Sequence, residues 1–288
     1  MDSLAPKNVE SRVGQRVKAR YELKQILGIG GQGAVYLARD LVDRDDVAVK
    51  VLHDKTGDPV ALERMYREAI ALVTLWSTHA VRVLDQGWTE DGCFAIVMEL
   101  LHGEDLGSLC DRVEGGGENL SVTAVRSIFA PVVVTLDRAH DHGIIHRDLK
   151  PGNIFVVDAD HGGGVRVLDF GFAKFLRMGK LTAAGMIAGS PTYLAPETWL
   201  GLDADSRVDV YALAVLIFRT LSGKPPFTGS LPQLLATVPR APRPSLHALR
   251  PDLPAALDEW VEHGLAIDRD ARFQNARGLW NAFLSIVG

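Results

Sequence analysis

The stretch that decides the fold is His146-Arg147-Asp148-Leu149-Lys150-Pro151-Gly152-Asn153, and the apolar run Ile154-Phe155-Val156-Val157 follows it at once. It places a carboxylate, a cation and a carboxamide in one short polar segment before a run of β-forming residues. Asp148 can orient an attacking hydroxyl and accept its proton, Lys150 can neutralise phosphoryl oxygens, and Asn153 can hold a metal ion. The segment therefore favours phosphoryl chemistry over the simpler interpretation, a charged surface turn.

Three histidines near this stretch, His140, His142 and His146, allow another interpretation. Their spacing crowds imidazoles together, as a metal site requires. No Cys or carboxylate ligand lies nearby at the spacing typical of zinc fingers, so the pattern favours a metal site of this kind only weakly.

A second acidic motif lies downstream, where the strand-like run Val165–Leu168 ends in Asp169-Phe170-Gly171. A carboxylate at a strand end is well placed for Mg²⁺, a hard cation that prefers oxygen ligands. Gly171 permits backbone torsions that would let the segment flip. A simple turn explains the tripeptide in isolation, but its position after Asn153 favours a metal-binding role.

The run Gly28-Ile29-Gly30-Gly31-Gln32-Gly33-Ala34-Val35 lies near the start of the chain. Glycines let a backbone approach phosphates and offer N–H donors, although a plain glycine-rich turn has the same composition. A dinucleotide-binding fingerprint would continue into a helix, whereas a β-branched and aromatic run follows here. The pattern therefore indicates a glycine loop in a β-hairpin that lies over nucleotide phosphates.

The next run, Val47-Ala48-Val49-Lys50, is a strand pattern that carries a lysine. A lysine inside an apolar strand must find an anion or reach water, so a phosphate partner and a solvent-facing edge strand are both open. The helical pattern that begins at Pro59 supplies Glu68 as an ion-pair partner for Lys50. Glu68 also stands four residues after Arg64, and the two could simply pair within the helix.

The periodic patterns divide the chain into two parts. Residues 1–20 are polar and indicate a loose lead-in, residues 21–100 indicate a small antiparallel sheet with one helix, and residues 104–288 are mainly helical. We therefore predict an α+β, two-lobed fold joined near Glu99–Gly103, with residues 239–254 as an ordered connector. The predicted strands are 21–27, 34–38, 47–52, 81–84, 94–98, 154–157 and 165–168, and the predicted helices begin at Pro59 and Ser121 or cover 208–221, 231–237, 253–266 and 276–287.

The composition is that of a globular protein and argues against several classes. With 31 Lys and Arg against 36 Asp and Glu, the chain lacks the basic footprint of a general nucleic-acid binder. Its longest apolar stretch, Val208–Leu221, contains two charges and falls short of the ~20 residues of a membrane span. The start of the chain is polar and has no signal-peptide core. Cys93 and Cys110 fit a reducing compartment as buried thiols. Because membrane and export signals are missing from the sequence, we expect a cytoplasmic location.

Together these segments resemble the eukaryotic-type Ser/Thr protein kinase family, and especially its bacterial members. The resemblance covers about residues 20–285, and the motifs occur in the family's order from the glycine loop to Ala195-Pro196-Glu197. An ordered set of this kind is highly specific, whereas no single motif is. It implies a catalytic domain over residues 21–288 that transfers the γ-phosphoryl group of Mg-ATP to a protein hydroxyl.

The resemblance implies a role for each matching position. Asp148 would be the catalytic base, Lys150 would match the Ser/Thr subclass, and Lys50, held by Glu68, would bind the α- and β-phosphates. Asn153 and Asp169 would carry Mg²⁺, for which Mn²⁺ is the alternative ion. The nucleotide site would comprise Gly28, Ile29, Gly30, Gly31, Gly33, Val35, Ala48, Lys50, Met98, Glu99, Leu101, Asn153 and Asp169.

Further positions match structural and regulatory residues of the family. Glu197 and Arg272 resemble its buried ion pair in the helical lobe, and Asp209 matches the aspartate that braces the catalytic loop. Arg147 stands beside the catalytic aspartate and would be stabilised by a phosphate, for which Thr182 is our preferred autophosphorylation site. An always-ordered segment is the alternative.

Two other functions remain to be weighed. An inactive kinase-shaped scaffold would usually have lost Lys50, Asp148 or Asp169, and all three are present. A small-molecule phosphotransferase would lack the long segment from Asp169 to Glu197, which in the kinase family docks a protein substrate. The sequence departs from the family at His79-Ala80-Val81 and in the glycine-rich loop 158–164, but at no catalytic position. It specifies neither the protein substrate nor the oligomeric state.

Overall fold

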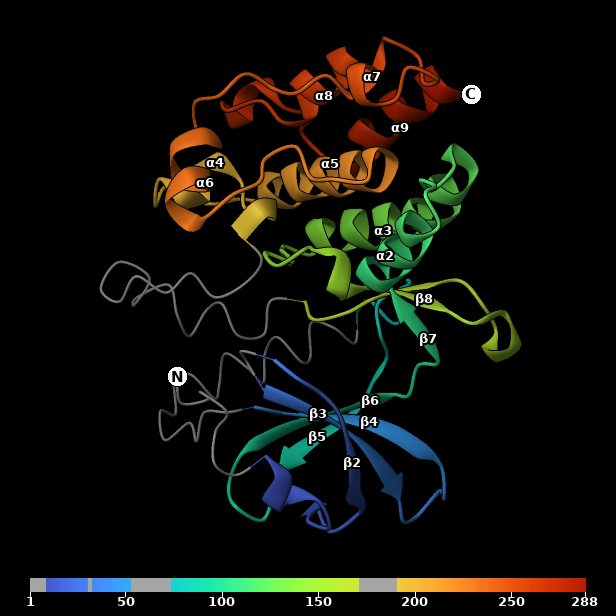
Figure 1. Cartoon of the computed structure of the whole chain (residues 1–288). Helices are drawn as coiled ribbons and strands as arrows, with labels where there is room; N and C mark the ends of the chain where they lie inside the picture. The colour runs from blue at the N-terminus through green and yellow to red at the C-terminus, as the bar shows by residue number, and fades with distance from the viewer. Residues whose placement is uncertain (1–8, 31–32, 53–73, 171–190) are drawn as a thin grey trace. The chain divides into compact units, whose positions relative to one another are not determined.

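The structure is a computed structural model, and it describes residues 9–30, 33–52, 74–170 and 191–288. These residues form two compact units (Figure 1). The first contains the described residues up to 76 together with 81–102, and the second contains 77–80, 103–170 and 191–288.

The first unit is built on one antiparallel sheet with the strand order β1-β2-β3-β4-β6-β5. The strands are β1 (Arg16–Val17), β2 (Tyr21–Ile29), β3 (Gly33–Asp40), β4 (Asp46–Leu52), β5 (Val83–Trp88) and β6 (Phe94–Glu99). The predicted strands at 21–27, 34–38, 47–52 and 94–98 lie within β2, β3, β4 and β6. The strand predicted at 81–84 instead covers Val83–Trp88, because β5 is an edge strand that tolerates the polar residues Asp85 and Gln86.

Asp85 ties the two edges of this sheet together. Lys18, just after β1, donates its backbone N–H to the carbonyl of Trp88 at 3.5 Å, and its Nζ lies 2.7 Å from Asp85 Oδ1. The hydroxyl of Tyr21 donates to Asp85 Oδ2 at 3.1 Å. These contacts give the edge strands partners, which limits edge-to-edge association with other chains.

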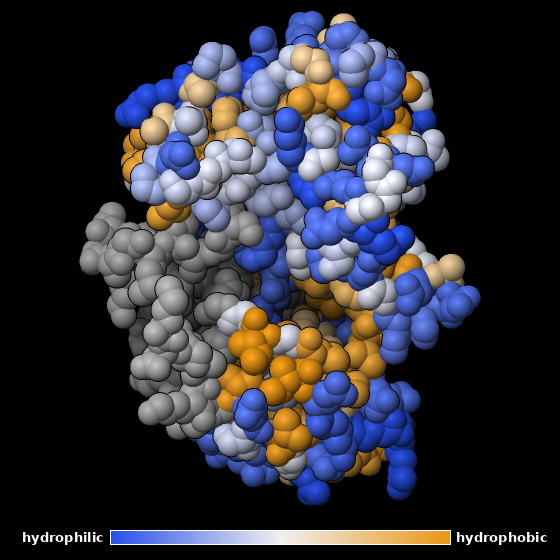
Figure 2. Space-filling model, in the orientation of Figure 1, coloured by the Kyte–Doolittle hydropathy of each residue, from blue (hydrophilic) through white to orange (hydrophobic). Residues whose placement is uncertain are grey.

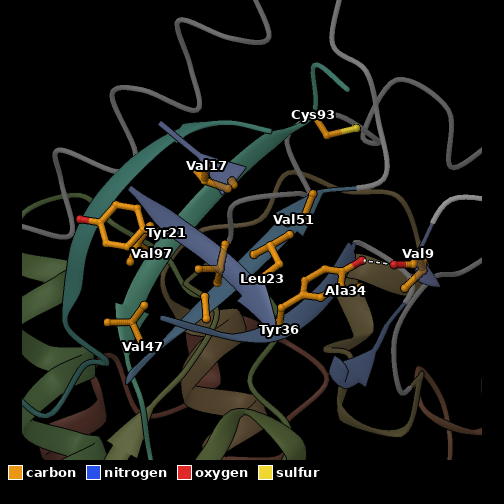
Figure 3. Close-up of a cluster of buried hydrophobic side chains, with 13 residues drawn as sticks. Val9, Val17, Tyr21, Leu23, Ala34, Tyr36, Val47, Val51, Cys93 and Val97 are labelled. Atoms are coloured by element: carbon orange, nitrogen blue, oxygen red, sulfur yellow. Dashed lines mark hydrogen bonds between the residues drawn. The ribbon is translucent and has the colours of Figure 1, made fainter. Parts of the chain in front are cut away.

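Residues 9–20 are part of this unit's core, which differs from the loose lead-in that their polar composition indicates. Val9 and Val17 are buried beside Leu23 and Tyr36, and the Tyr36 hydroxyl donates to the carbonyl of Val9 at 2.8 Å (Figure 3). Arg12, in the short helix η1 (Glu10–Arg12), is 3% exposed and forms an ion pair with Asp91 at 3.0 Å. The composition of this segment did not indicate its order, because only two buried valines and one buried ion pair attach it to the sheet.

The second unit is mainly helical (Figure 1). Nearly all residues of its helix α5 (Arg207–Ser222) are buried. A small sheet of order β7-β8-β9 accompanies the helices. The elements of the second unit, in chain order, are β7 (Gly103–Asp105), α2 (Leu106–Gly115), α3 (Val122–Asp141), η2 (Pro151–Asn153), β8 (Ile154–Val157), η3 (Ala159–His161), β9 (Val165–Val167), η4 (Pro191–Tyr193), α4 (Pro196–Trp199), α5, α6 (Leu231–Thr237), α7 (Leu246–Leu249), α8 (Leu257–Gly264), η5 (Arg269–Ala271) and α9 (Ala276–Val287).

Several predictions for the second unit are confirmed. Ser121 caps α3 by accepting the backbone N–H of Ala124, and α6 and α9 have the predicted bounds. The connector 239–254 is ordered, since Arg243 donates to the carbonyls of Leu265, Val238 and Ala241. The helix predicted at 253–266 is shorter, because residues 254–257 close a turn before α8 begins. Helix α2 was not predicted, and the helix predicted from Pro59 lies outside the described residues.

The two departures from the family pattern have defined shapes. His79 receives the N–H of Val167 on its carbonyl at 2.8 Å, and Ala80 forms a parallel bridge with Val167. In the loop 158–164, Gly162, Gly163 and Gly164 have φ of 96°, 63° and 86°, which glycine adopts without steric cost. Both cysteines are buried free thiols, as expected. No helix within the described ranges is both long and apolar enough to cross a membrane.

Candidate active site

The 146–153 loop brings a carboxylate, an ammonium and a carboxamide into direct contact. Lys150 Nζ lies 2.8 Å from Asp148 Oδ2, and the Asn153 amide donates to the carbonyl of Asp148 at 2.7 Å. The Asp148 side chain keeps 12% of its surface exposed. Because the loop ends in η2 and continues directly into β8, its backbone is attached to the small sheet, which fixes the position of these three side chains. The arrangement can hold a hydroxyl against Asp148 while Lys150 supplies positive charge.

Asp209 of α5 anchors the start of this loop. Its Oδ2 accepts the backbone N–H of His146 at 2.7 Å, and its Oδ1 accepts that of Arg147 at 2.8 Å. Burial alone would raise the pKa of Asp209, but the hydrogen bond from His140, the nearby imidazoles and the backbone N–H of His146 hold that pKa below its usual value. Asp209 is therefore an ionised, buried acceptor for the loop backbone.

His146 joins the loop to the strand that precedes Asp169. Its Nδ1 accepts the N–H of Asp148 at 3.3 Å, so Nε2 carries the proton and donates to the carbonyl of Leu168 at 2.8 Å. Burial lowers the pKa of His146, which favours this neutral form. The Leu168 N–H in turn donates to the carbonyl of Asn153 at 2.8 Å. These bonds fix the two segments that carry the predicted metal ligands, Asn153 and Asp169.

Two residues of the site have left-handed backbone conformations. The φ of Arg147 is 61° and that of Asp169 is 52°. Such conformations cost a non-glycine residue about 1–2 kcal/mol, and they cluster at functional sites. For Arg147, the hydrogen bond from its N–H to Asp209 offsets this cost. For Asp169, the bonds that the preceding residue Leu168 makes to His146 and Asn153 do the same.

The donor set fits a divalent magnesium ion. Asp169 offers a carboxylate, and the Asn153 amide nitrogen faces the backbone of Asp148, which leaves its oxygen as a ligand. Magnesium is usually held by one or two such ligands together with substrate phosphates. In the described part of the chain no three His, Cys, Asp or Glu residues cluster as a full metal cage.

The three neighbouring histidines do not converge on one point. His140 Nε2 contacts Asp209 at 2.8 Å, His142 Nδ1 donates to the carbonyl of Arg138 at 2.8 Å, and His146 Nε2 donates to the carbonyl of Leu168 at 2.8 Å. Since each ring has its own partner and no such cluster exists among the described residues, the histidine metal site is excluded there.

In the first unit, the glycine loop connects β2 and β3 as a hairpin. Ile29 pairs with Ala34, and the N–H of Gly30 donates to the carbonyl of Gly33 at 2.8 Å. A Cβ on Gly33 would lie 2.3 Å from the carbonyl oxygen of Val51, so this position requires glycine. A strand follows the glycines, which excludes the dinucleotide-binding alternative.

Lys50 lies on β4, an interior strand. It pairs with Val35 of β3 and Ile96 of β6, and only 5% of its surface is exposed. The alternative of a solvent-facing lysine on an edge strand is therefore wrong. Ala48 lies two residues earlier, opposite Met98.

The predicted hinge continues from β6. Glu99 receives the backbone N–H of Arg82 on Oε1 at 2.9 Å and the Arg82 guanidinium on Oε2 at 3.1 Å, and Leu101 lies outside regular secondary structure, before β7. Apolar surface gathers on part of the visible face of this unit (Figure 2). Leu27 and Ile29 of β2 are 49% and 55% exposed, and Leu27 is a surface residue of the hairpin that motif reading missed. An apolar residue directly before the glycines that are predicted to cover phosphates was the available signal.

Glu197 and Arg272 form a two-pronged ion pair deep in the second unit. Arg272 Nη1 and Nη2 donate to Glu197 Oε1 and Oε2 at 2.8 and 2.6 Å. The pair attaches α4, and with it the end of the Ala-Pro-Glu segment, to the turn after η5. Gly31, Glu68, Gly171 and Thr182 lie outside the described residues.

A glycine hairpin and an interior lysine on an antiparallel sheet, with the 146–153 loop and Asp169 in a helical unit, define a protein of the kinase class. The family model of the protein kinase domain matches residues 21–241, and the chain belongs to this family. The predicted α+β kinase fold, and the resemblance to bacterial Ser/Thr members, are confirmed.

Named relatives are bacterial. The serine/threonine-protein kinase PksC of Streptomyces coelicolor is 35% identical over 275 residues, which cover 93% of this chain and 49% of that protein. PrkC of Bacillus subtilis is 32% identical over 269 residues, covering 93% of this chain and 40% of its own length. The crystal structure of the Mycobacterium tuberculosis PknI kinase domain matches with a TM-score of 0.73 and 30% identity, covering 95% of this chain and 98% of that one. This chain thus spans about half or less of these two curated relatives.

Proposed function

We propose that this protein is a serine/threonine kinase that transfers the γ-phosphoryl group of ATP to a Ser or Thr hydroxyl of a protein. The contact of Asp148 with Lys150 and Asn153 is the observation that carries the proposal. The family and the named Ser/Thr kinases among its relatives support it. Because the reaction consumes ATP, the proposal includes a cytoplasmic site of action.

In the proposed reaction Asp148 accepts a hydrogen bond from the substrate hydroxyl, aligns its oxygen and takes its proton as the phosphoryl group transfers. Lys150, already 2.8 Å from Asp148, neutralises charge on the phosphoryl oxygens. Asn153 and Asp169 would hold Mg²⁺, which supplies charge neutralisation at the phosphates when bound. The protein's contribution is alignment and fixed charge, and the bonds through Asp209 and His146 provide the rigidity that alignment needs.

The first unit would hold the nucleotide. Lys50, on the interior strand β4, would bind the α- and β-phosphates through its ammonium group. Backbone N–H groups around Gly28, Gly30 and Gly33 would cover the phosphates, while Ala48, Leu27 and Met98 supply apolar surface for the base. Glu99 and Leu101 would bond the adenine through their backbone.

The test is phosphate transfer from radiolabelled ATP to the protein itself and to a generic basic protein. Asp148→Asn keeps the shape of the side chain but removes the base, so turnover should fall by about 10²–10⁴-fold while ATP affinity changes little. Serine or threonine should be the labelled residue. Equal labelling by wild type and Asp148→Asn, or none by either, would favour the inactive scaffold.

The same experiment addresses regulation. We propose Thr182 as the autophosphorylation site, because a phosphate there could pair with Arg147 beside the catalytic aspartate. Phosphopeptide mapping after incubation with ATP should find label on Thr182. Label confined to other residues, with full activity in Thr182→Ala, would contradict this part of the proposal.

A further inference from the structure

Arg243 lies in the connector between α6 and α7, and its hydrogen bonds in the described structure go to backbone carbonyls only. Its Nε donates to Leu265 at 2.6 Å, and its Nη1 donates to Val238 and Ala241 at 3.2 and 2.9 Å. The guanidinium also lies over the ring of Phe227, 5.1 Å from the ring centre. Nη2 is buried and has no hydrogen-bond partner within the described residues. This half-buried cation therefore keeps one unused donor nitrogen and has no carboxylate partner there.

A second unused donor is the hydroxyl of Tyr211, in α5. Tyr211 is 0% exposed, and its hydroxyl has no hydrogen-bond partner in the part of the chain that the structure describes. Burial raises the pKa of Tyr211 to about 12, so the hydroxyl keeps its proton at neutral pH. The ring lies 5.0 Å from the guanidinium of Arg272, whose Nε donates to the carbonyl of Ala266 at 2.7 Å. The preceding carbonyl, that of Leu265, is the one that holds Arg243, so these side chains form one cluster.

The charges of this cluster do not balance among the described residues. Glu197 accepts both terminal nitrogens of Arg272 and neutralises that guanidinium, whereas no carboxylate contacts Arg243 there. Burial, and then the charge of Arg272, lowers the pKa of Arg243. Arg219 is half-buried too, but its hydrogen bond to Glu114 outweighs burial and raises its pKa. The cluster thus carries one positive charge without a negative partner, which is costly away from water.

We propose that Nη2 of Arg243 and the hydroxyl of Tyr211 form a binding site for a monovalent halide ion such as chloride. One negative charge balances the cluster, and an N–H and an O–H are donors that an anion accepts. Because both donor atoms are buried, the site suits an ion of a single atom. The bound ion would attach the connector to α5, and the site does not depend on phosphoryl transfer.

The test measures thermal melting in sodium chloride and in sodium gluconate at equal ionic strength. Chloride at about ten times its dissociation constant should raise the midpoint of wild type by roughly 3 °C, because it binds only the native chain. Tyr211→Phe keeps the ring and should weaken chloride binding about 10–100-fold, the effect of one hydrogen bond to a charged group. Arg243→Met should abolish it. Arg250→Met is the matched control, since Arg250 also donates to a carbonyl, that of Leu221, but has its own carboxylate in Asp252.

The sign of the tyrosine substitution separates an ion from a buried water. In gluconate Tyr211→Phe should be as stable as wild type or more so, because it removes a buried donor that has no acceptor, and in chloride wild type should gain on it. Crystals grown in bromide should show anomalous scattering between Arg243 Nη2 and the Tyr211 hydroxyl. A chloride effect that is absent in wild type, or equal in wild type, Tyr211→Phe and Arg250→Met, would overturn the inference, as would bromide found only elsewhere. If Arg243→Met does not fold, Tyr211→Phe and the bromide crystal decide.

Discussion

At the scale of single residues, Arg272 is the largest fully buried side chain among the described residues, and its charge is held by several acceptors. Glu197 accepts both terminal nitrogens, and Nε donates to the carbonyl of Ala266 at 2.7 Å. The guanidinium also lies over the ring of Tyr211 at 5.0 Å. Removing one member of such a buried ion pair is costly, because the other charge then stays buried without its partner.

We therefore predict that Glu197→Gln destabilises the protein by about 3 kcal/mol, because it leaves the Arg272 charge buried and uncompensated. Arg272→Met should cost at least as much, since the carbonyls of Ala266, Arg207 and Ile267 lose their donor as well. The double variant Glu197→Gln/Arg272→Met should cost clearly less than the sum of the two. Urea unfolding of the four proteins in a double-mutant cycle measures the coupling, and additive losses would contradict it.

At the scale of elements, the turn between β3 and β4 is built around one carboxylate. Asp40 accepts the backbone N–H of Val42 at 2.9 Å and the Arg20 guanidinium at 2.6 Å. The hydrogen bond from Arg20, against the opposing effect of burial, lowers the pKa of Asp40 from 3.8 to about 2. The turn that aligns the Lys50 strand with the glycine hairpin thus depends on an ionised Asp40.

The sign of the pH dependence follows from this lowered pKa. The contribution of Asp40 to stability is complete above about pH 4 and is lost as the pH falls through about 2. We predict that Asp40→Asn is less stable than wild type by about 1 kcal/mol at neutral pH, a value kept small because Arg20 is 34% exposed. The difference should shrink toward pH 2. Asp43→Asn, whose carboxylate also contacts Arg20 but is 62% exposed, is the control, and denaturant melts across this pH range decide.

Local patterns predicted the elements that depend on local sequence. Strand β8 and helices α6 and α9 have the expected bounds because their apolar periodicity is uninterrupted. Strand β1 was missed, since it has two residues and exists only through pairing with β2. The sequence pattern alone could not establish the glycine hairpin or the interior position of Lys50, because both depend on which strands pair in the sheet.

The sequence likewise predicted the parts of the candidate site that are local in the chain, and not those that depend on distant contacts. The members of the 146–153 loop are neighbours in sequence, so their types and spacing indicated their chemistry directly. Asp209 is 63 residues from His146, and no periodicity links them, so only the family resemblance indicated it. For His140 the sequence offers only a weakly favoured metal site, since its actual partner, Asp209, lies 69 residues away and no spacing indicates it.

At the scale of the whole molecule, the residues assigned to the nucleotide come from both compact units. Lys50 and the glycine hairpin belong to the first, whereas Asn153 and Asp169 belong to the second. If the proposed assignments are right, Mg-ATP stabilises the native chain by mass action, and substitutions of these residues in either unit reduce that stabilisation. This linkage is independent of any phosphoryl transfer, so it can be measured without a protein substrate.

We predict that Mg-ATP at about 100 times its dissociation constant raises the melting midpoint of wild type by roughly 5 °C. Lys50→Met keeps the buried strand but removes the phosphate-binding charge, so most of the shift should disappear. Asp169→Asn should remove the dependence on magnesium, and Asn is the suitable replacement because it tolerates the left-handed φ of 52°. Thermal melts with ATP, in magnesium and in excess EDTA, measure both effects, and His142→Asn should behave as wild type. Should the shift be the same in EDTA and in both variants, the nucleotide would be binding elsewhere, and residues of the two units would not serve one site.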